Sequence, residues 1–101
     1  MIIYNVTCNV SESMAAEWLN WMKEEHIPEV MATGLFSSYR ILKLLTVVED
    51  NEGLNYAIQY SCDSVEAFDK YVEIYGPGLK AKTYEKYGDS VLAFRTLLEE
   101  V

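Results

Sequence analysis

Residues 18–31 read Trp18-Leu19-Asn20-Trp21-Met22-Lys23-Glu24-Glu25-His26-Ile27-Pro28-Glu29-Val30-Met31, and they hold both tryptophans and the only histidine of the chain. At 100° per residue, an α-helix brings the apolar residues of this region onto one side, namely Ala15, Trp18, Leu19, Met22 and His26. The segment is therefore predicted to be an amphipathic helix whose apolar stripe includes the histidine.

This first helix is predicted to run from about residue 12 to about residue 32. Ser11-Glu12-Ser13 offers N-cap side chains just before the helical pattern begins, and Gly34 follows its end. Pro28 lacks a backbone donor and disfavours helix at the preceding residue, so we expect a kink or a tightened last turn there.

Strands are predicted on both sides of this helix. Residues 2–10 and 54–62 alternate between apolar and polar side chains, which is typical of strands with one buried face. Residues 35–47 are rich in aliphatic, aromatic and β-branched side chains and are predicted to form a long strand. Residues 49–53 are predicted to form an acidic hairpin-like turn, and residues 90–99 are predicted to form the last strand.

A second helix is predicted between the last two strands. Asp63 and Glu66 have the spacing of a capping box, with Asp63 as N-cap. An apolar stripe follows and is interrupted by Gly76-Pro77-Gly78, which indicates either a break between two short helices or a kink. Because Leu79 is still on the stripe, we predict one kinked helix that extends to about Tyr87.

The resulting order, βαββαβ, predicts a single α+β domain over residues 1–101 with a ferredoxin-like fold. Right-handed connections give a four-stranded antiparallel sheet of order 4-1-3-2, with both helices on one face. The other face of the sheet would carry Asn5, Thr7, Asn9, Ala57, Gln59 and Ser61 from the central strands. One edge strand would add Arg40, Leu42 and Leu44, or their neighbours, and the other would add Arg95 and Leu97. Because this mixture of leucines and polar groups is poorly suited to bare water, we predict a homodimer through the open sheet face.

The composition limits the classes of partner. Sixteen acidic residues oppose eight basic ones, giving a net charge of −8, which disfavours nucleic acid and anionic membranes. No apolar run is long enough to span a bilayer, and the first residues lack the basic region of a signal peptide. We expect a soluble cytoplasmic protein. Lys80, Lys82 and Lys86 are interpreted as cations near a helix end, where they favour the dipole.

The two cysteines, Cys8 and Cys62, lie in predicted neighbouring strands near opposite ends, too far apart for a disulfide. We expect both to be reduced, buried and structural. They have no metal-ligand spacing, and no phosphate loop, nucleophile elbow or dinucleotide fingerprint is present. We therefore predict no metal and no cofactor.

Three segments carry a resemblance to a known family: residues 18–36, Tyr56-Ala57-Ile58-Gln59-Tyr60, and residues 94–99. They resemble a family of small uncharacterised bacterial proteins, a domain of unknown function common among Bacteroidetes. The resemblance covers nearly the whole chain and implies the dimeric α+β barrel, but it implies no activity. The wider superfamily includes cofactor-independent monooxygenases, isomerases, haem-degrading enzymes and binding proteins. Haem-degrading members place their histidine on the second helix, whereas His26 is on the first, which argues against haem.

The candidate site is centred on His26, whose ordinary pKa near 6.5 suits a general base or a hydrogen-bond partner. The alternative is a histidine at the core edge, bonded to a carbonyl or a tyrosine. Five side chains could line an aromatic ligand pocket under the first helix or simply fill a core: Trp18, Met22, Tyr4, Tyr56 and Tyr60. Arg40 and Arg95 could hold an anionic substrate, although we favour an ion pair with a partner chain.

Three functions follow. We favour a homodimeric barrel that binds a small, largely apolar molecule near His26. The second is a cofactor-independent enzyme of monooxygenase or isomerase type, with His26 as general base and Tyr56 or Tyr60 as donor. The third is a structural or regulatory dimer with a filled core and no pocket.

Overall fold

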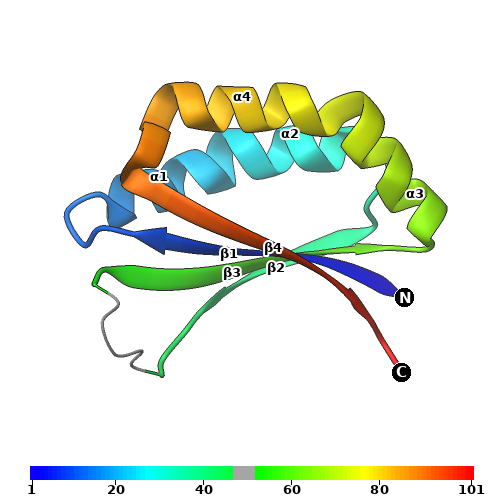
Figure 1. Ribbon diagram of the computed structural model, residues 1–101, viewed down its shortest axis with the longest axis horizontal. Coiled ribbons are helices and arrows are strands. Elements are labelled where there is room, and N and C mark those ends of the chain that lie inside the picture. The colour runs from blue at the N-terminus through cyan, green and yellow to red at the C-terminus, as the bar shows by residue number, and fades with distance from the viewer. Residues whose placement is uncertain (47–51) are drawn as a thin grey trace.

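The computed structural model describes residues 1–46 and 52–101. In this part of the chain one antiparallel sheet has the order β2-β3-β1-β4. Its strands are β1 (Ile2–Val10), β2 (Ser38–Lys43), β3 (Leu54–Cys62) and β4 (Val91–Glu99). Both helical segments cover the same face of this sheet (Figure 1). The ferredoxin-like α+β fold and its strand order are therefore confirmed.

Each helical segment consists of two α-helices joined by a π-helical turn. The first segment comprises α1 (Ala15–Trp21), η1 (Met22–His26) and α2 (Ile27–Ala32). The second comprises α3 (Val65–Lys70), η2 (Tyr71–Tyr75) and α4 (Gly76–Tyr87), and a short 3-10 turn, η3 (Gly88–Ser90), leads into β4.

Each of the two π-helical turns ends two residues before one of the two prolines of the chain. The amide of Ile27, just before Pro28, donates to the Met22 carbonyl five residues back. The amide of Gly76, just before Pro77, donates to the Tyr71 carbonyl in the same way. The kink predicted at both places is thus a widened turn, which accommodates a residue with no N–H and a ring that would crowd the preceding carbonyl. Of the two alternatives predicted at Pro28, a kink or a tightened last turn, the structure excludes the tightened turn.

The starts of both helical segments differ from the prediction. The first begins at Ala15, three residues later than predicted, because residues 11–14 form a turn in which the Met14 amide donates to the Ser11 carbonyl at 3.0 Å. The second is capped by Ser64, not Asp63: the Ser64 hydroxyl accepts a hydrogen bond from the Ala67 amide at 3.2 Å. The backbone of Ser64 is still extended, with φ −152° and ψ 161°, so the helix starts at Val65 and its cap lies one residue later than predicted.

The strand predicted over residues 35–47 is shorter in the structure. β2 begins at Ser38, and Phe36 is buried in the core before it. The end of that predicted strand and most of the predicted turn, residues 47 and 49–51, lie outside the described residues. Within that turn, Gly53 has a φ of +90°, and a Cβ there would stand 2.6 Å from the Val10 carbonyl oxygen, so only glycine fits.

The register of the strands fixes which side chains share a face. Tyr4 lies opposite Tyr60 and Leu97, and Val6 lies opposite Ile58 and Arg95. Because directly paired residues point to the same face, Arg95 and Leu97 lie on the helix-covered side. Their predicted place on the open face is wrong. Residues 91–98 do not alternate between apolar and polar types, so the sequence of this edge strand contained no signal for its orientation.

We call the helix-free face the open face. It carries the predicted central residues, with Arg40 and Leu42 from β2 paired to Gln59 and Ala57. From β4 it carries the four side chains that alternate with those on the helix-covered side: Leu92, Phe94, Thr96 and Leu98.

The two cysteines lie at opposite ends of neighbouring strands, as predicted. Both are buried and free, and Cys62 pairs with Ile2 whereas Cys8 pairs with Tyr56, at opposite ends of the same pair of strands. Burial raises the pKa of the Cys8 thiol to about 11. Among residues 1–46 and 52–101, no helix has the length and apolar character needed to cross a membrane.

Candidate functional site

A cavity of about 320 Å³ lies between the helices and the sheet. Trp18, Met22 and His26 from the first helical segment line it, as do Tyr4 and Tyr60 from the two central strands. Five of the six predicted site residues therefore meet in one place. Tyr56 does not line the cavity: it is buried, and its ring packs against Trp18 with centroids 5.4 Å apart. This cavity has the volume of a small-molecule site at the lower end of the usual range.

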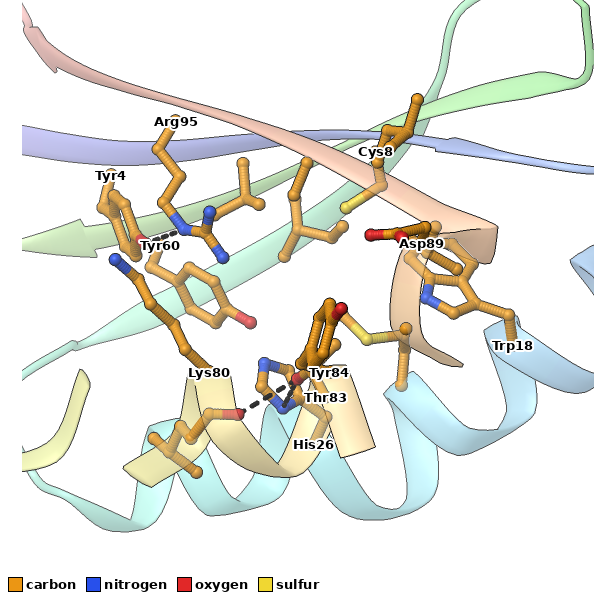
Figure 2. A pocket seen from close by; sticks show the side chains of 18 of the residues that line it. Tyr4, Cys8, Trp18, His26, Tyr60, Lys80, Thr83, Tyr84, Asp89 and Arg95 are labelled. Carbon is orange, nitrogen blue, oxygen red and sulfur yellow. Dashed lines mark hydrogen bonds between the residues drawn. The ribbon is translucent and has the colours of Figure 1, made fainter. Parts of the chain in front are cut away.

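The cavity opens between α4 and β4. Lys80 and Tyr84 from α4, Asp89 from η3, and Ala93 and Arg95 from β4 line it and are all exposed to solvent. Its deeper walls are buried apolar and aromatic side chains, including Trp18, Met22, Ile58, Tyr60 and Leu79. The site thus combines a largely apolar interior with a polar mouth (Figure 2).

The aromatic end of the cavity is a cluster around Tyr4. Its ring stacks on those of Tyr60 and Phe36, with centroids 6.0 and 6.2 Å away, and lies 5.9 Å from that of Tyr71. Burial raises the pKa of Tyr4 and Tyr60, and that of Tyr71 to about 12. These hydroxyls are therefore protonated at neutral pH and can act as hydrogen-bond donors.

His26 ends the first π-helical turn, and its ring stacks on Trp21 with centroids 5.2 Å apart. Burial lowers the pKa of its imidazole, and Arg95 adds to the effect, while Glu29 opposes it. The imidazole is therefore neutral at pH 7.

The tautomer of His26 follows from its neighbour in α4. The Thr83 hydroxyl donates to the Leu79 carbonyl at 3.1 Å and lies 3.5 Å from Nδ1 of His26. When that hydroxyl proton is directed at Leu79, Thr83 can only accept from Nδ1, which favours the tautomer that is protonated at Nδ1. The other ring nitrogen, Nε2, keeps its lone pair and faces the space between helices and sheet (Figure 2). It can accept a hydrogen bond or a proton from a bound molecule.

Arg95 is the main residue that sequence reasoning placed wrongly. Its Nε donates a hydrogen bond to the Tyr4 hydroxyl at 3.1 Å, across β1 and β4 (Figure 2). Lys80 was interpreted only as a cation near a helix end. Of the three lysines in that group, Lys82 pairs with Glu29 at 2.9 Å and Lys86 lies over the Tyr87 ring, whereas Lys80 lines the cavity. The i, i+3, i+4 spacing of Lys80, Thr83 and Tyr84 was the available signal, because it places all three on one face of a helix.

The wall of the cavity contains an unpaired donor. The Trp18 indole N–H is buried and has no hydrogen-bond partner among the described residues. Figure 2 shows this nitrogen on the side of the ring turned toward the interior of the pocket. An unmet buried donor costs free energy, and a ligand acceptor would offset that cost.

The chain belongs to the family DUF4286, a domain of unknown function, whose profile matches residues 1–101. No curated protein matches it. Among solved structures, a Bacillus halodurans protein of the ethyl tert-butyl ether D (EthD) family is similar, with a TM-score of 0.73 and 10% identity over all of both chains.

Two other solved structures are similar. One is a Deinococcus radiodurans protein named for antibiotic biosynthesis monooxygenases, with a TM-score of 0.65 and 16% identity over 100% of this chain and 93% of that one. The other is a dimeric ferredoxin-like protein from an uncultured marine organism, with a TM-score of 0.66 and 9% identity over 99% and 97% of the two chains. At these identities the likeness shows the fold alone.

Proposed function

We propose that this protein binds a small, largely apolar molecule between its helices and its sheet, beside His26. The observation that carries the proposal is the cavity itself: it is lined by Trp18, Met22, Ile58 and Tyr60 and opens to solvent between α4 and β4. A well-formed apolar pocket with a few convergent polar groups is the usual form of a small-molecule site. The third function considered, a structural dimer, predicts a filled core, and the cavity argues against it.

A titration with 1-naphthol, a neutral two-ring probe, tests the binding. We expect ¹H–¹⁵N spectra to show saturable shifts of the Trp18 indole N–H and of the His26 ring nitrogens. The Ala93→Phe variant places a ring at the mouth from an exposed position and should weaken binding. Ala81→Phe is the matched control, because Ala81 is exposed on α4 and does not line the cavity. Binding that leaves the Trp18 and His26 signals unmoved would contradict the proposal.

The geometry of His26 favours a second function, a cofactor-independent enzyme of monooxygenase or isomerase type. A neutral imidazole held through Nδ1 presents Nε2 to the cavity as a base, and the protonated Tyr60 hydroxyl lies in the same pocket. Tyr56, the other donor considered, does not reach it. For any pocket ligand that is turned over, His26→Ala should abolish turnover without changing the circular dichroism spectrum. Undiminished turnover in that variant would exclude His26 as the base.

We further propose that two copies associate through their open faces. Leu92 and Phe94 in β4 are 61% and 69% exposed, and Leu42 and Leu98 add further apolar surface on the same face. An apolar surface of this kind is typical of an interaction site. The similar marine protein is named a dimer. Sedimentation equilibrium of the intact chain measures the association directly, and a monomer at all concentrations would overturn it.

A further inference from the structure

The charges at the mouth of the cavity are unevenly distributed. Arg95 and Lys80 stand at the end near Tyr4, whereas Asp89 stands at the other end, near Trp18 (Figure 2). The whole chain carries a net charge of −8, so the two positive charges beside the apolar cavity are opposite in sign to the protein as a whole. The mouth therefore has a cationic end and an acidic end.

Both cations are free to bind a ligand. Among residues 1–46 and 52–101, the one ion pair joins Lys82 to Glu29, and neither Arg95 nor Lys80 has a carboxylate partner. Arg95 uses only its Nε, which donates to the Tyr4 hydroxyl at 3.1 Å. That hydrogen bond orients the guanidinium, while its two terminal nitrogens remain available. Such a fork matches the two oxygens of a carboxylate, and an ammonium adds a second charge-assisted donor.

We propose that the ligand of this pocket is a carboxylate with a compact apolar body of one or two rings. This inference rests on the proposed binding function and specifies its chemistry. The carboxylate lies at the mouth against Arg95 and Lys80, and the apolar body extends inward against Trp18, Met22 and Ile58. Asp89 repels the reversed orientation. Because both cations are exposed, the carboxylate stays partly hydrated and bears little desolvation cost.

A matched pair of probes tests the charge. Isothermal titration calorimetry with 1-naphthoate and with neutral 1-naphthamide compares ligands of nearly the same shape. We expect naphthoate to bind about tenfold more tightly or better, the effect of one charge-assisted contact. Raising the salt concentration should weaken naphthoate binding and leave naphthamide binding unchanged. This comparison uses the unaltered protein, so it does not depend on whether any variant folds.

Substitutions then locate the preference. Arg95→Gln and Lys80→Gln should each reduce the ratio of the two affinities several-fold, because naphthoate loses a charge-assisted contact and naphthamide loses at most a neutral-acceptor hydrogen bond. Arg95→Lys, which keeps the charge and loses the fork, should give an intermediate ratio. Lys23→Gln is the control for net charge, because Lys23 is exposed on the first helical segment and does not line the cavity. It should leave both affinities unchanged.

The failures of the two proposals are distinguishable. If both probes shift the Trp18 indole signal and bind equally, the pocket binds ligands but the carboxylate inference is overturned. A naphthoate preference that persists in both Gln variants places the charge contact elsewhere and also overturns it. If neither probe binds, both the carboxylate inference and the binding function that supports it fall.

Discussion

The two faces of the sheet use polar side chains in opposite ways. On the helix-covered face, polar groups are few and are held singly at the cavity: Arg95 on Tyr4, and His26 beside Thr83. On the open face, amide and hydroxyl groups form a continuous ladder across all four strands. Arg40 donates to Gln59 at 2.8 Å, Gln59 donates to Asn5 at 3.2 Å, and Asn5 donates to Thr96 at 3.2 Å.

This difference shows what each face is suited to do. The polar groups of the open face already form hydrogen bonds with one another, so few donors and acceptors remain for a ligand. A partner would contact mainly the apolar side chains around this ladder. Polar groups with spare donors beside an apolar cavity are suited to bind a small molecule. In our proposal, the open face of the sheet recognises a second copy and the covered face recognises a ligand.

The largest expected effect of a single change is on the covered face. Trp18 is 1% exposed and supports both the cavity wall and Tyr56. Trp18→Ala should lower the free energy of unfolding by about 3–5 kcal/mol, as is typical of a buried aromatic residue. Chemical denaturation measures it. Phe94→Ala removes an aromatic ring from the open face and should change the unfolding of the monomer by less than about 1 kcal/mol. Equal losses of unfolding free energy in Trp18→Ala and Phe94→Ala would contradict this difference between the two faces.

The next effect is on association. Phe94→Asp introduces a charge at the most exposed aromatic position of the open face. Burying that ring in a dimer is worth about 1.5–3 kcal/mol, so the variant should raise the dissociation constant by about tenfold or more. Sedimentation equilibrium measures the shift. Tyr84→Asp, at an exposed aromatic residue on the helix side, is the control and should leave association unchanged.

A smaller effect is expected where Tyr4 accepts the Arg95 hydrogen bond. Tyr4→Phe keeps the ring in its cluster and removes only the hydroxyl, so it should cost about 1 kcal/mol of stability. Thr96→Val is the matched change on the open face, since it removes one acceptor of the Asn5 amide. Thermal unfolding compares the two variants. A Tyr4→Phe protein as stable as the parent would show that the hydrogen bond contributes nothing measurable.

The smallest effect is the pH dependence contributed by His26. Its folded pKa is lowered, so the unfolded chain binds a proton more readily, and stability falls as pH drops below about 6.5 toward the folded value. Above about pH 6.5, His26 is neutral in both the folded and the unfolded chain and no longer lowers the stability. His26→Gln should remove this slope, which amounts to less than one proton. Unfolding free energies at pH 5 and 7.5, with the histidine pKa measured by NMR, check it. A histidine that titrates above 6.5 in the folded protein would reverse the sign.

Much of the fold was readable from local patterns. The alternation in residues 2–10 and 54–62 fixed the two central strands and the side chains under the helices, because a strand with one buried face repeats every two residues. Helical spacing likewise placed Trp18, Met22 and His26 on one stripe. Pro28 and Pro77 marked both interruptions, although the widened turns there result from backbone hydrogen bonding over five residues, which no side-chain pattern reports.

The sequence by itself determined the order of elements, the composition of the central sheet and the place of His26 on an apolar face. Only the tertiary structure decided that a cavity remains there, that Tyr56 is packed away from it, and that Arg95 and Lys80 reach its mouth. The reason is physical: an edge strand without alternation takes its orientation from its partner's register, and a cavity depends on how separate elements pack together. Neither property is encoded in a local stretch of residues.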